Sequence, residues 1–224
     1  MPMHPRILDV RTKILKKNDE LARAMRARFA AASVYVTNLV SSPGSGKTEL
    51  LTETLRTLKE TSRVAAVVGD LATENDARRL ATSGAETQQI VTDGLCHLEA
   101  DMVERAIVQW DLDTYNYLFI ENVGNLVCPT SWDLGEDLRV LLLAVTEGED
   151  KPLKYPTLIN TVDVVVLSKI DLANAVGFDR ALALRNIAEV RPGAEVFEVS
   201  ARTGQGMEAW LELLRRRASK KRTL

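Results

Sequence analysis

The most constraining feature of the sequence is a loop of small residues, Ser41-Ser-Pro-Gly-Ser-Gly-Lys47-Thr48. The apolar run before it, 34–40, is typical of a buried strand, and 49–59 after it places leucines at helical spacing. A loop of this kind between strand and helix can wrap a phosphate, because backbone N–H groups and the helix N-terminus face the anion together. The alternative is an ordinary glycine-rich turn. Residues expected to hold the phosphates are Gly44, Ser45, Gly46, Lys47, Thr48 and Glu49, with Lys47 at the outer phosphates and Thr48 on Mg²⁺.

One position departs from the usual G-x-x-x-x-G-K-[ST] pattern, because Ser41 stands where the first glycine is expected. A serine there needs a negative φ or accepts some strain.

Apolar segments typical of strands alternate with helical segments along the rest of the chain. The predicted strands are 63–69, 89–92, 117–121, 138–145, 163–167 and 195–199, and the predicted helices are 9–31, 76–84, 96–110, 178–190 and 206–217. This alternation predicts an α/β fold, a doubly wound and mostly parallel sheet with helices on both faces, preceded by an N-terminal helix. We expect a 1–31 extension, a 32–218 nucleotide-binding domain and a 219–224 basic tail. Ligands in such sheets lie beyond the carboxyl ends of the strands.

The ends of the chain and its composition limit the classes of partner. The N-terminal helix is expected to pack on the sheet; the alternative is a helix that binds a partner or a second copy. The last ten residues carry six Lys or Arg and no acid, which we interpret as a solvated tail without a nucleic-acid role. Neither a membrane span nor a signal peptide is recognisable. With only two cysteines in the chain, we expect a cytoplasmic protein without a disulfide framework.

A polar strand end, Ser168-Lys169-Ile170-Asp171, indicates which base is bound. It resembles the Asn-Lys-x-Asp element of guanine-specific GTPases, with serine in place of asparagine. A carboxylate at Asp171 can accept from guanine N1–H and the 2-amino group, whereas adenine would leave it unpaired. Lys169 can lay its aliphatic stem over the base. The alternative is a polar strand end with a helix cap. Ser200, Ala201 and Arg202 resemble the Ser-Ala-Lys segment whose backbone meets guanine.

Two carboxylates at strand ends are candidate ligands of Mg²⁺, together with Thr48. Glu121-Asn-Val-Gly124 resembles the Asp-x-x-Gly switch segment of GTPases, in which the carboxylate holds Mg²⁺ through water and the glycine N–H contacts the γ-phosphate. Asp70 ends the preceding strand and is the second candidate; its alternative role is a helix N-cap. The predicted catalytic residues are Lys47, Asp70, Glu121 and Gly124.

A second group, Cys96, His97 and Cys128, combines two thiols with an imidazole. We expect the Cys96-His97 pair at the start of a helix and Cys128 four residues beyond Gly124. This donor set suits Zn²⁺ or Ni²⁺, with a fourth ligand from water, a carboxylate or a second chain. The alternative is two buried thiols and a capping histidine.

Taken together, these segments resemble the HypB family of hydrogenase nickel-incorporation GTPases. The matching stretches are Asn38-Leu-Val-Ser-Ser-Pro-Gly-Ser-Gly-Lys-Thr48, Gly69-Asp70 with Asp76-Ala-Arg78, Cys96-His-Leu-Glu-Ala100, Ile120-Glu-Asn-Val-Gly-Asn-Leu-Val-Cys-Pro129, Thr146-Glu-Gly-Glu-Asp-Lys-Pro-Leu-Lys-Tyr-Pro156 and Ser200-Ala-Arg-Thr-Gly204. The resemblance implies a SIMIBI-like P-loop GTPase with slow intrinsic hydrolysis of GTP to GDP and phosphate. It also implies nickel, or zinc in the same site, bound by Cys96, His97 and Cys128 at a homodimer interface. The implied partners are other hydrogenase-maturation proteins and the hydrogenase large subunit.

The sequence departs from many family members, because it has neither an N-terminal cysteine motif nor a histidine-rich run. Three rival functions are a metal carrier without significant GTP turnover, a kinase on the same scaffold, and a urease-type nickel-insertion GTPase. The urease relatives carry Cys-Pro-His, whereas Cys96 and His97 are adjacent here. Lys151 and Lys154 lie either in a solvated loop or near a nucleotide, across a dimer in that case.

Overall fold

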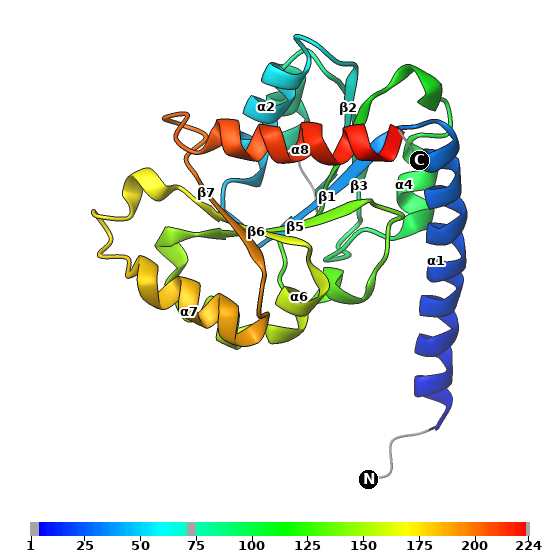
Figure 1. The fold of residues 1–224 in the computed structure, drawn as a ribbon. Coiled ribbons are helices and arrows are strands. Elements are labelled where there is room, and N and C mark those ends of the chain that lie inside the picture. The colour runs from blue at the N-terminus through cyan, green and yellow to red at the C-terminus, as the bar shows by residue number, and fades with distance from the viewer. Residues whose placement is uncertain (1–4, 71–74, 223–224) are drawn as a thin grey trace.

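The computed structural model describes residues 5–70 and 75–222. Seven parallel strands form one sheet in the order β3-β2-β4-β1-β5-β6-β7 (Figure 1). Their bounds are β1 Tyr35–Ser41, β2 Val64–Asp70, β3 Glu86–Val91, β4 Tyr117–Glu121, β5 Leu138–Ala144, β6 Val164–Ser168 and β7 Glu195–Val199. The doubly wound parallel sheet predicted from the sequence is confirmed.

Helices cover both faces of the sheet because the strands expose apolar side chains on each. They are α1 Pro5–Ala31, α2 Lys47–Leu58, α3 Asn75–Ala81, α4 Ala100–Ala106, α5 Lys151–Lys154, α6 Pro156–Thr161, α7 Arg180–Val190 and α8 Met207–Arg222. One core cluster joins the sheet to α2, α3 and α8. On the other face, α1 and α4 share a second cluster, and α6 and α7 share a third.

The C-terminal half of α1 packs on the sheet, as one of the two alternatives predicted. Ala22, Met25 and Phe29 are at most 1% exposed and lie in the cluster that contains α4. Nearer its start, α1 extends past the body of the domain (Figure 1), and Ile14 is 49% exposed there. The buried stripe therefore anchors only the second half of this helix.

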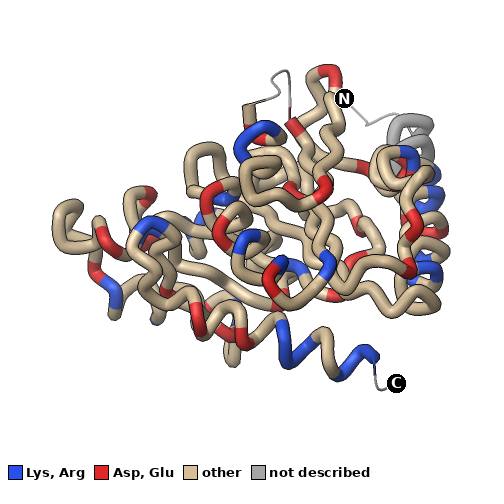
Figure 2. Tube along the Cα trace, turned by 90° about the horizontal axis from the view of Figure 1, so that it is seen from above, with Lys and Arg blue, Asp and Glu red and all other residues tan. Residues whose placement is uncertain are grey.

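Two predicted helices differ from the observed ones. The helix expected at 96–110 begins at Ala100 and ends at Ala106, so Cys96 and His97 lie in the preceding loop and not at a helix start. The last helix continues past 217 to Arg222 and carries the basic residues along its end (Figure 2). Leu213, Leu214 and Ala218 are buried and keep this helix on the sheet, so it does not fray where its charge rises.

Two short helices were missed. Residues 151–154 and 156–161 form α5 and α6, each with a proline in its first turn, where the missing N–H leaves no intrahelical hydrogen bond unmade. No helix among residues 5–70 and 75–222 has the length and apolar character needed to cross a membrane.

Candidate functional site

The loop between β1 and α2 forms the floor of a groove at the carboxyl end of the sheet. Gly44 and Gly46 adopt positive φ values of 73° and 92°, which residues with a Cβ rarely adopt. Ser41 does not adopt a positive φ, so a serine at the first motif position introduces no backbone strain. Lys47 is 8% exposed, and its Nζ donates to Ser41 Oγ at 2.9 Å. Ser41, which replaces the usual glycine, therefore provides a hydrogen-bond acceptor for Lys47.

Two buried atoms in this groove have no hydrogen-bond partner. They are Ser45 Oγ in the loop and Oε2 of Glu121 at the end of β4. The other carboxylate oxygen, Oε1, accepts from Thr48 Oγ1 at 2.7 Å. Because buried polar atoms are nearly always paired in folded proteins, these orphans fit a site built for phosphate oxygens and a cation. The donor set, one hydroxyl and carboxylates, suits Mg²⁺.

Burial shapes the charges of the same two side chains. It raises the pKa of Glu121 to about 7, against the attraction of Lys47, which lowers it. Burial also lowers the pKa of Lys47, although the nearby carboxylates, Glu121 first, raise it. Each charge would thus gain from the opposite charges of a cation and a phosphate brought together.

The phosphate groove has a volume of about 460 Å³ and includes most of the residues predicted from the sequence. Asp70, at the end of β2, lines it beside Glu121. The alternative role of Asp70 as a helix N-cap stays a prediction, because the residues that follow it, 71–74, lie outside the described part of the chain. Gly124 also lines the groove, and a Cβ there would lie 3.0 Å from the Pro43 Cα, so the switch-like segment lies directly against the phosphate loop.

Sequence reasoning missed two residues of α3 that line this groove, Asp76 and Arg79. Arg79 is held by Glu49, with its NH2 2.6 Å from Oε2. In the sequence, Asp76 is only part of a stretch that matches the family, and Arg79 lies directly after that stretch. Only the packing of α3 beside α2 brings them to the groove.

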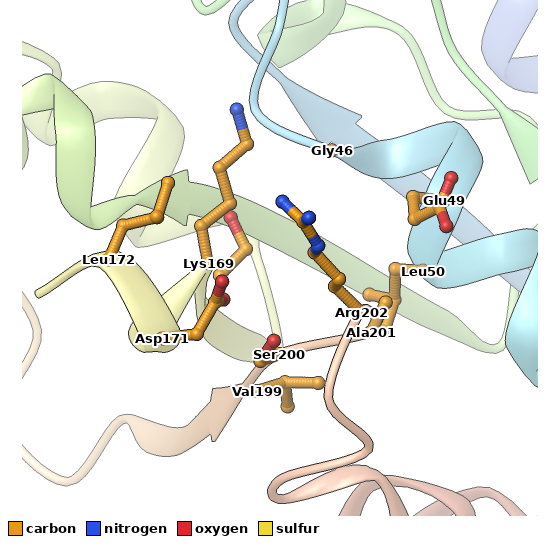
Figure 3. A pocket seen from close by; sticks show the side chains of 11 residues that line it. Gly46, Glu49, Leu50, Lys169, Asp171, Leu172, Val199, Ser200, Ala201 and Arg202 are labelled. Carbon is orange, nitrogen blue, oxygen red and sulfur yellow. The ribbon is translucent and has the colours of Figure 1, made fainter.

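A second hollow of about 480 Å³ continues from the phosphate groove, sharing Gly46, Glu49 and Lys169 with it. Asp171 and Arg202 line it from two different loops (Figure 3). The other predicted base-contacting residues, Ser168, Ser200 and Ala201, line it as well.

Two side chains at the end of β6 tie this hollow to the phosphate loop. Ser168 Oγ donates to Ser45 O at 2.7 Å, and Lys169 Nζ donates to Gly44 O at 2.6 Å. Lys169 has φ of 58°, a left-handed conformation that a lysine adopts only when its surroundings enforce it. Because its single hydroxyl donates to the loop, Ser168 braces the site and has no amide to offer a base.

The thiols and the imidazole converge, although 32 residues separate the two cysteines. One ligand atom from each of Cys96, His97 and Cys128 lies within 4.8 Å of the others. The structure pairs Cys96 with Cys128 as a disulfide with a Cα–Cα distance of 6.2 Å, a single bond that the sequence did not predict. A metal ion bound by both sulfurs requires their reduced form, because only thiolates are ligands.

His97 is held in a mostly buried position suited to a ligand. Its side chain is 12% exposed, and its ring stacks on Trp132 with centroids 4.4 Å apart. Nε2 lies 3.5 Å from Glu99 Oε1 yet is a buried atom without a well-formed hydrogen bond. Burial lowers the pKa of His97, and Glu99 raises it by a smaller amount. The lowered pKa favours the neutral imidazole, which is the form that binds metals. The alternative of a capping histidine is not what the structure shows.

A single loop connects the groove to these ligands. Asn122 and Gly124 follow β4, and Cys128 opens the short 3₁₀ helix Cys128–Ser131. Asn125 Oδ1 accepts from the N–H of Cys128 at 3.1 Å, which fixes the ligand to the segment beside the phosphate loop. By contrast, Lys151 and Lys154 pair with Glu147 and Asp150 and line neither hollow.

Comparisons with known proteins agree with this geometry. The family model described as "CobW/HypB/UreG, nucleotide-binding domain" matches residues 35–198. Hydrogenase maturation factor HypB of Escherichia coli (strain K12) is 49% identical over 209 residues, which cover 93% of this chain and 72% of the relative. Hydrogenase/urease maturation factor HypB of Helicobacter hepaticus is 42% identical over 202 residues, which cover 88% of this chain and 83% of the relative.

A solved structure is similar over the same length. The crystal structure of HypB from Helicobacter pylori in complex with nickel superimposes with a TM-score of 0.86 at 39% identity, covering 91% of this chain and 96% of that one. The chain therefore belongs to the HypB family of hydrogenase maturation factors, within the CobW/HypB/UreG nucleotide-binding domains.

Proposed function

We propose that the chain is a GTP-hydrolysing nickel carrier that delivers nickel during maturation of [NiFe]-hydrogenase. One observation supports the proposal above others: Glu121 at the end of β4 and Gly124 in the loop after it line the phosphate groove, and the same loop leads to Cys128 in the thiol–imidazole set. A change at the terminal phosphate can therefore reach a metal ligand through four residues of backbone.

In this proposal the nucleotide lies across the two hollows. Residues 44–49 hold the phosphates through backbone N–H groups, and Lys47 neutralises the outer ones. Asp171 accepts from the guanine edge, Lys169 covers the base, and the 200–202 segment closes the hollow. Thr48, Asp70 and Glu121 hold Mg²⁺, which supplies charge neutralisation at the phosphates.

Hydrolysis transfers the γ-phosphoryl group to water and yields GDP and phosphate. Gly124 contacts that group through its N–H. The lack of a side chain lets its backbone lie against Pro43 of the phosphate loop. Catalysis of this transfer depends on positioning and charge, and Arg79 is an arginine that lines the phosphate groove and pairs with Glu49. A tethered arginine and no glutamine lining the groove are consistent with slow intrinsic turnover.

Nickel is the cargo and is bound by Cys96, His97 and Cys128 in their reduced form, with Zn²⁺ able to occupy the same site. A homodimer would complete the coordination, and the recipients would be other hydrogenase-maturation proteins and the hydrogenase large subunit, in the cytoplasm. The printed name of the Helicobacter hepaticus relative also mentions urease, so nickel insertion into a urease is the second candidate.

The test is a nickel titration of reduced protein with GDP and with a non-hydrolysable GTP analogue, with molar mass measured in each state. Cys128→Ala should lose most nickel affinity, while Val127→Ala, a neighbour that is 65% exposed, should keep it. Oxidised wild type should bind no nickel, because the disulfide removes both thiolates. Equal nickel affinity and equal mass in both nucleotide states would reject the coupling.

A further inference from the structure

The two loops that carry the thiol–imidazole set are joined by a side chain of α1. Asn18 lies in α1 and is 7% exposed, although no sequence motif surrounds it. Its Oδ1 accepts from the backbone N–H of Ala100 at 2.9 Å, and its Nδ2 donates to the carbonyl of Asp133 at 2.8 Å. The first contact is three residues beyond His97, and the second is five residues beyond Cys128.

Each of the two hydrogen bonds of Asn18 fixes backbone that is close in sequence to a residue at the thiol–imidazole set. Ala100 is the first residue of α4, and its N-cap, Glu99, makes no side-chain cap, so Asn18 caps this helix from α1. Asp133 follows Trp132, the ring that stacks on His97, and the carbonyl of Trp132 accepts from Arg139 NH2 at 2.7 Å. The amide of Asn18 therefore joins the backbone three residues after His97 to the backbone that directly follows Trp132.

The simplest alternative is that Asn18 is only a helix cap. A cap needs the acceptor oxygen alone, whereas the amide nitrogen is used on a different loop, 115 residues away in sequence. Asparagine is also a poor residue for a helix interior, where a leucine would fill the space between α1 and α4 with less cost. Both amide atoms are in use at a buried position, so the side chain serves two loops at once.

We propose that Asn18 is a positioning residue of the metal site, which sets the spacing between the Cys96–His97 loop and the Cys128 loop. The inference rests on the proposed metal-binding function. Hydrogen-bond partners that orient metal ligands contribute about tenfold to hundredfold in metal affinity. It follows that nickel affinity depends on the position of α1 on the domain. A displacement of this helix would loosen both ligand loops together.

The experiment measures Ni²⁺ affinity of the reduced full chain by competition with a chelator, and records the visible spectrum of the Co²⁺-substituted protein. Asn18→Leu is close in size and removes both hydrogen bonds; it should weaken Ni²⁺ binding at least about tenfold and alter the cobalt bands. GTP affinity should remain unchanged, because Asn18 lines neither nucleotide hollow. Arg28→Ala is the matched control, since it breaks the 3.2 Å contact between α1 and Glu104 of α4 and touches neither loop.

A second variant separates the bracket from the cap and serves if Asn18→Leu does not fold. Asn18→Asp keeps an acceptor for Ala100 but has no donor for Asp133, and should also lose nickel affinity. Wild-type affinity and cobalt bands in either variant would overturn the inference, as would an equal loss in Arg28→Ala. If reduced wild type itself bound no nickel, the proposed function would fail instead, so the two failures can be told apart.

Discussion

The buried carboxyl group of Glu121 should make the free protein lose stability as pH rises. Its side chain is 2% exposed, and burial raises its pKa from 4.5 to about 7. The folded protein thus binds this proton more tightly than the unfolded chain does. The stabilisation is fully present below pH 4.5 and is lost as pH rises through about 7.

The difference between these two pKa values corresponds to about 3 kcal/mol, most of which is lost between pH 5 and pH 8. Glu121→Gln removes the titration and keeps the Oε1 acceptor for Thr48. The free energy of unfolding, measured by urea denaturation at both pH values, should therefore fall less in the variant than in wild type, by most of that amount.

Glu53→Gln is the control, because it makes the same substitution on α2 at a side chain that pairs with Arg56 and does not line the phosphate groove. Saturating Mg²⁺ and GDP should flatten the wild-type profile, since a cation beside Glu121 favours the carboxylate. Parallel profiles for wild type and Glu121→Gln would refute the reasoning, because the carboxyl group would then titrate alike in the folded and unfolded chains.

Three further predictions concern the nucleotide. Lys47→Ala should abolish GTP binding in equilibrium titration, and retained affinity would remove the phosphate-loop assignment. Asp171→Asn should move base preference from guanine toward xanthine in competition binding, because an amide can donate where the carboxylate only accepts; an unchanged preference would show that another residue distinguishes the bases. Arg79→Ala should slow single-turnover GTP hydrolysis at least about tenfold with GTP affinity within threefold, while Arg78→Ala should leave the rate alone; equal rates would exclude Arg79 from charge stabilisation.

The sequence alone determined the sheet and the floor of the nucleotide site. Tyr117–Glu121 was predicted to the residue, because a buried parallel strand is a nearly continuous apolar run. Glu195–Val199 was also predicted to the residue, although this strand is only partly buried. The phosphate loop was recognisable because its chemistry is local: glycines, a lysine and a threonine must follow one another between strand and helix. The base-contacting residues followed from the same rule, each within a few residues of a strand end.

Local pattern was misleading where a helical period ended early. The residues from 96 onward suggested a helix, yet Leu98 packs onto Gly69, where a Cβ would meet its side chain at 2.7 Å. That contact lies directly after Cys96 and His97, which form a bend in the loop before α4, and α4 begins only at Ala100. Tertiary packing here outweighs propensity, which contributes only a few tenths of a kcal/mol per residue.

Only the tertiary structure decided which distant side chains work together. Asn18 donates to a loop 115 residues away, and Arg79 of α3 pairs with Glu49 of α2. Cys96 meets Cys128, although β4 lies between them in the chain. Such contacts leave no period or motif in the sequence, because they depend on how helices pack on a sheet and not on the residues beside them. The residue types that give each site its chemistry can therefore be recognised from short stretches of sequence. The connections between α1, the metal ligands and the phosphate groove exist only in the folded chain.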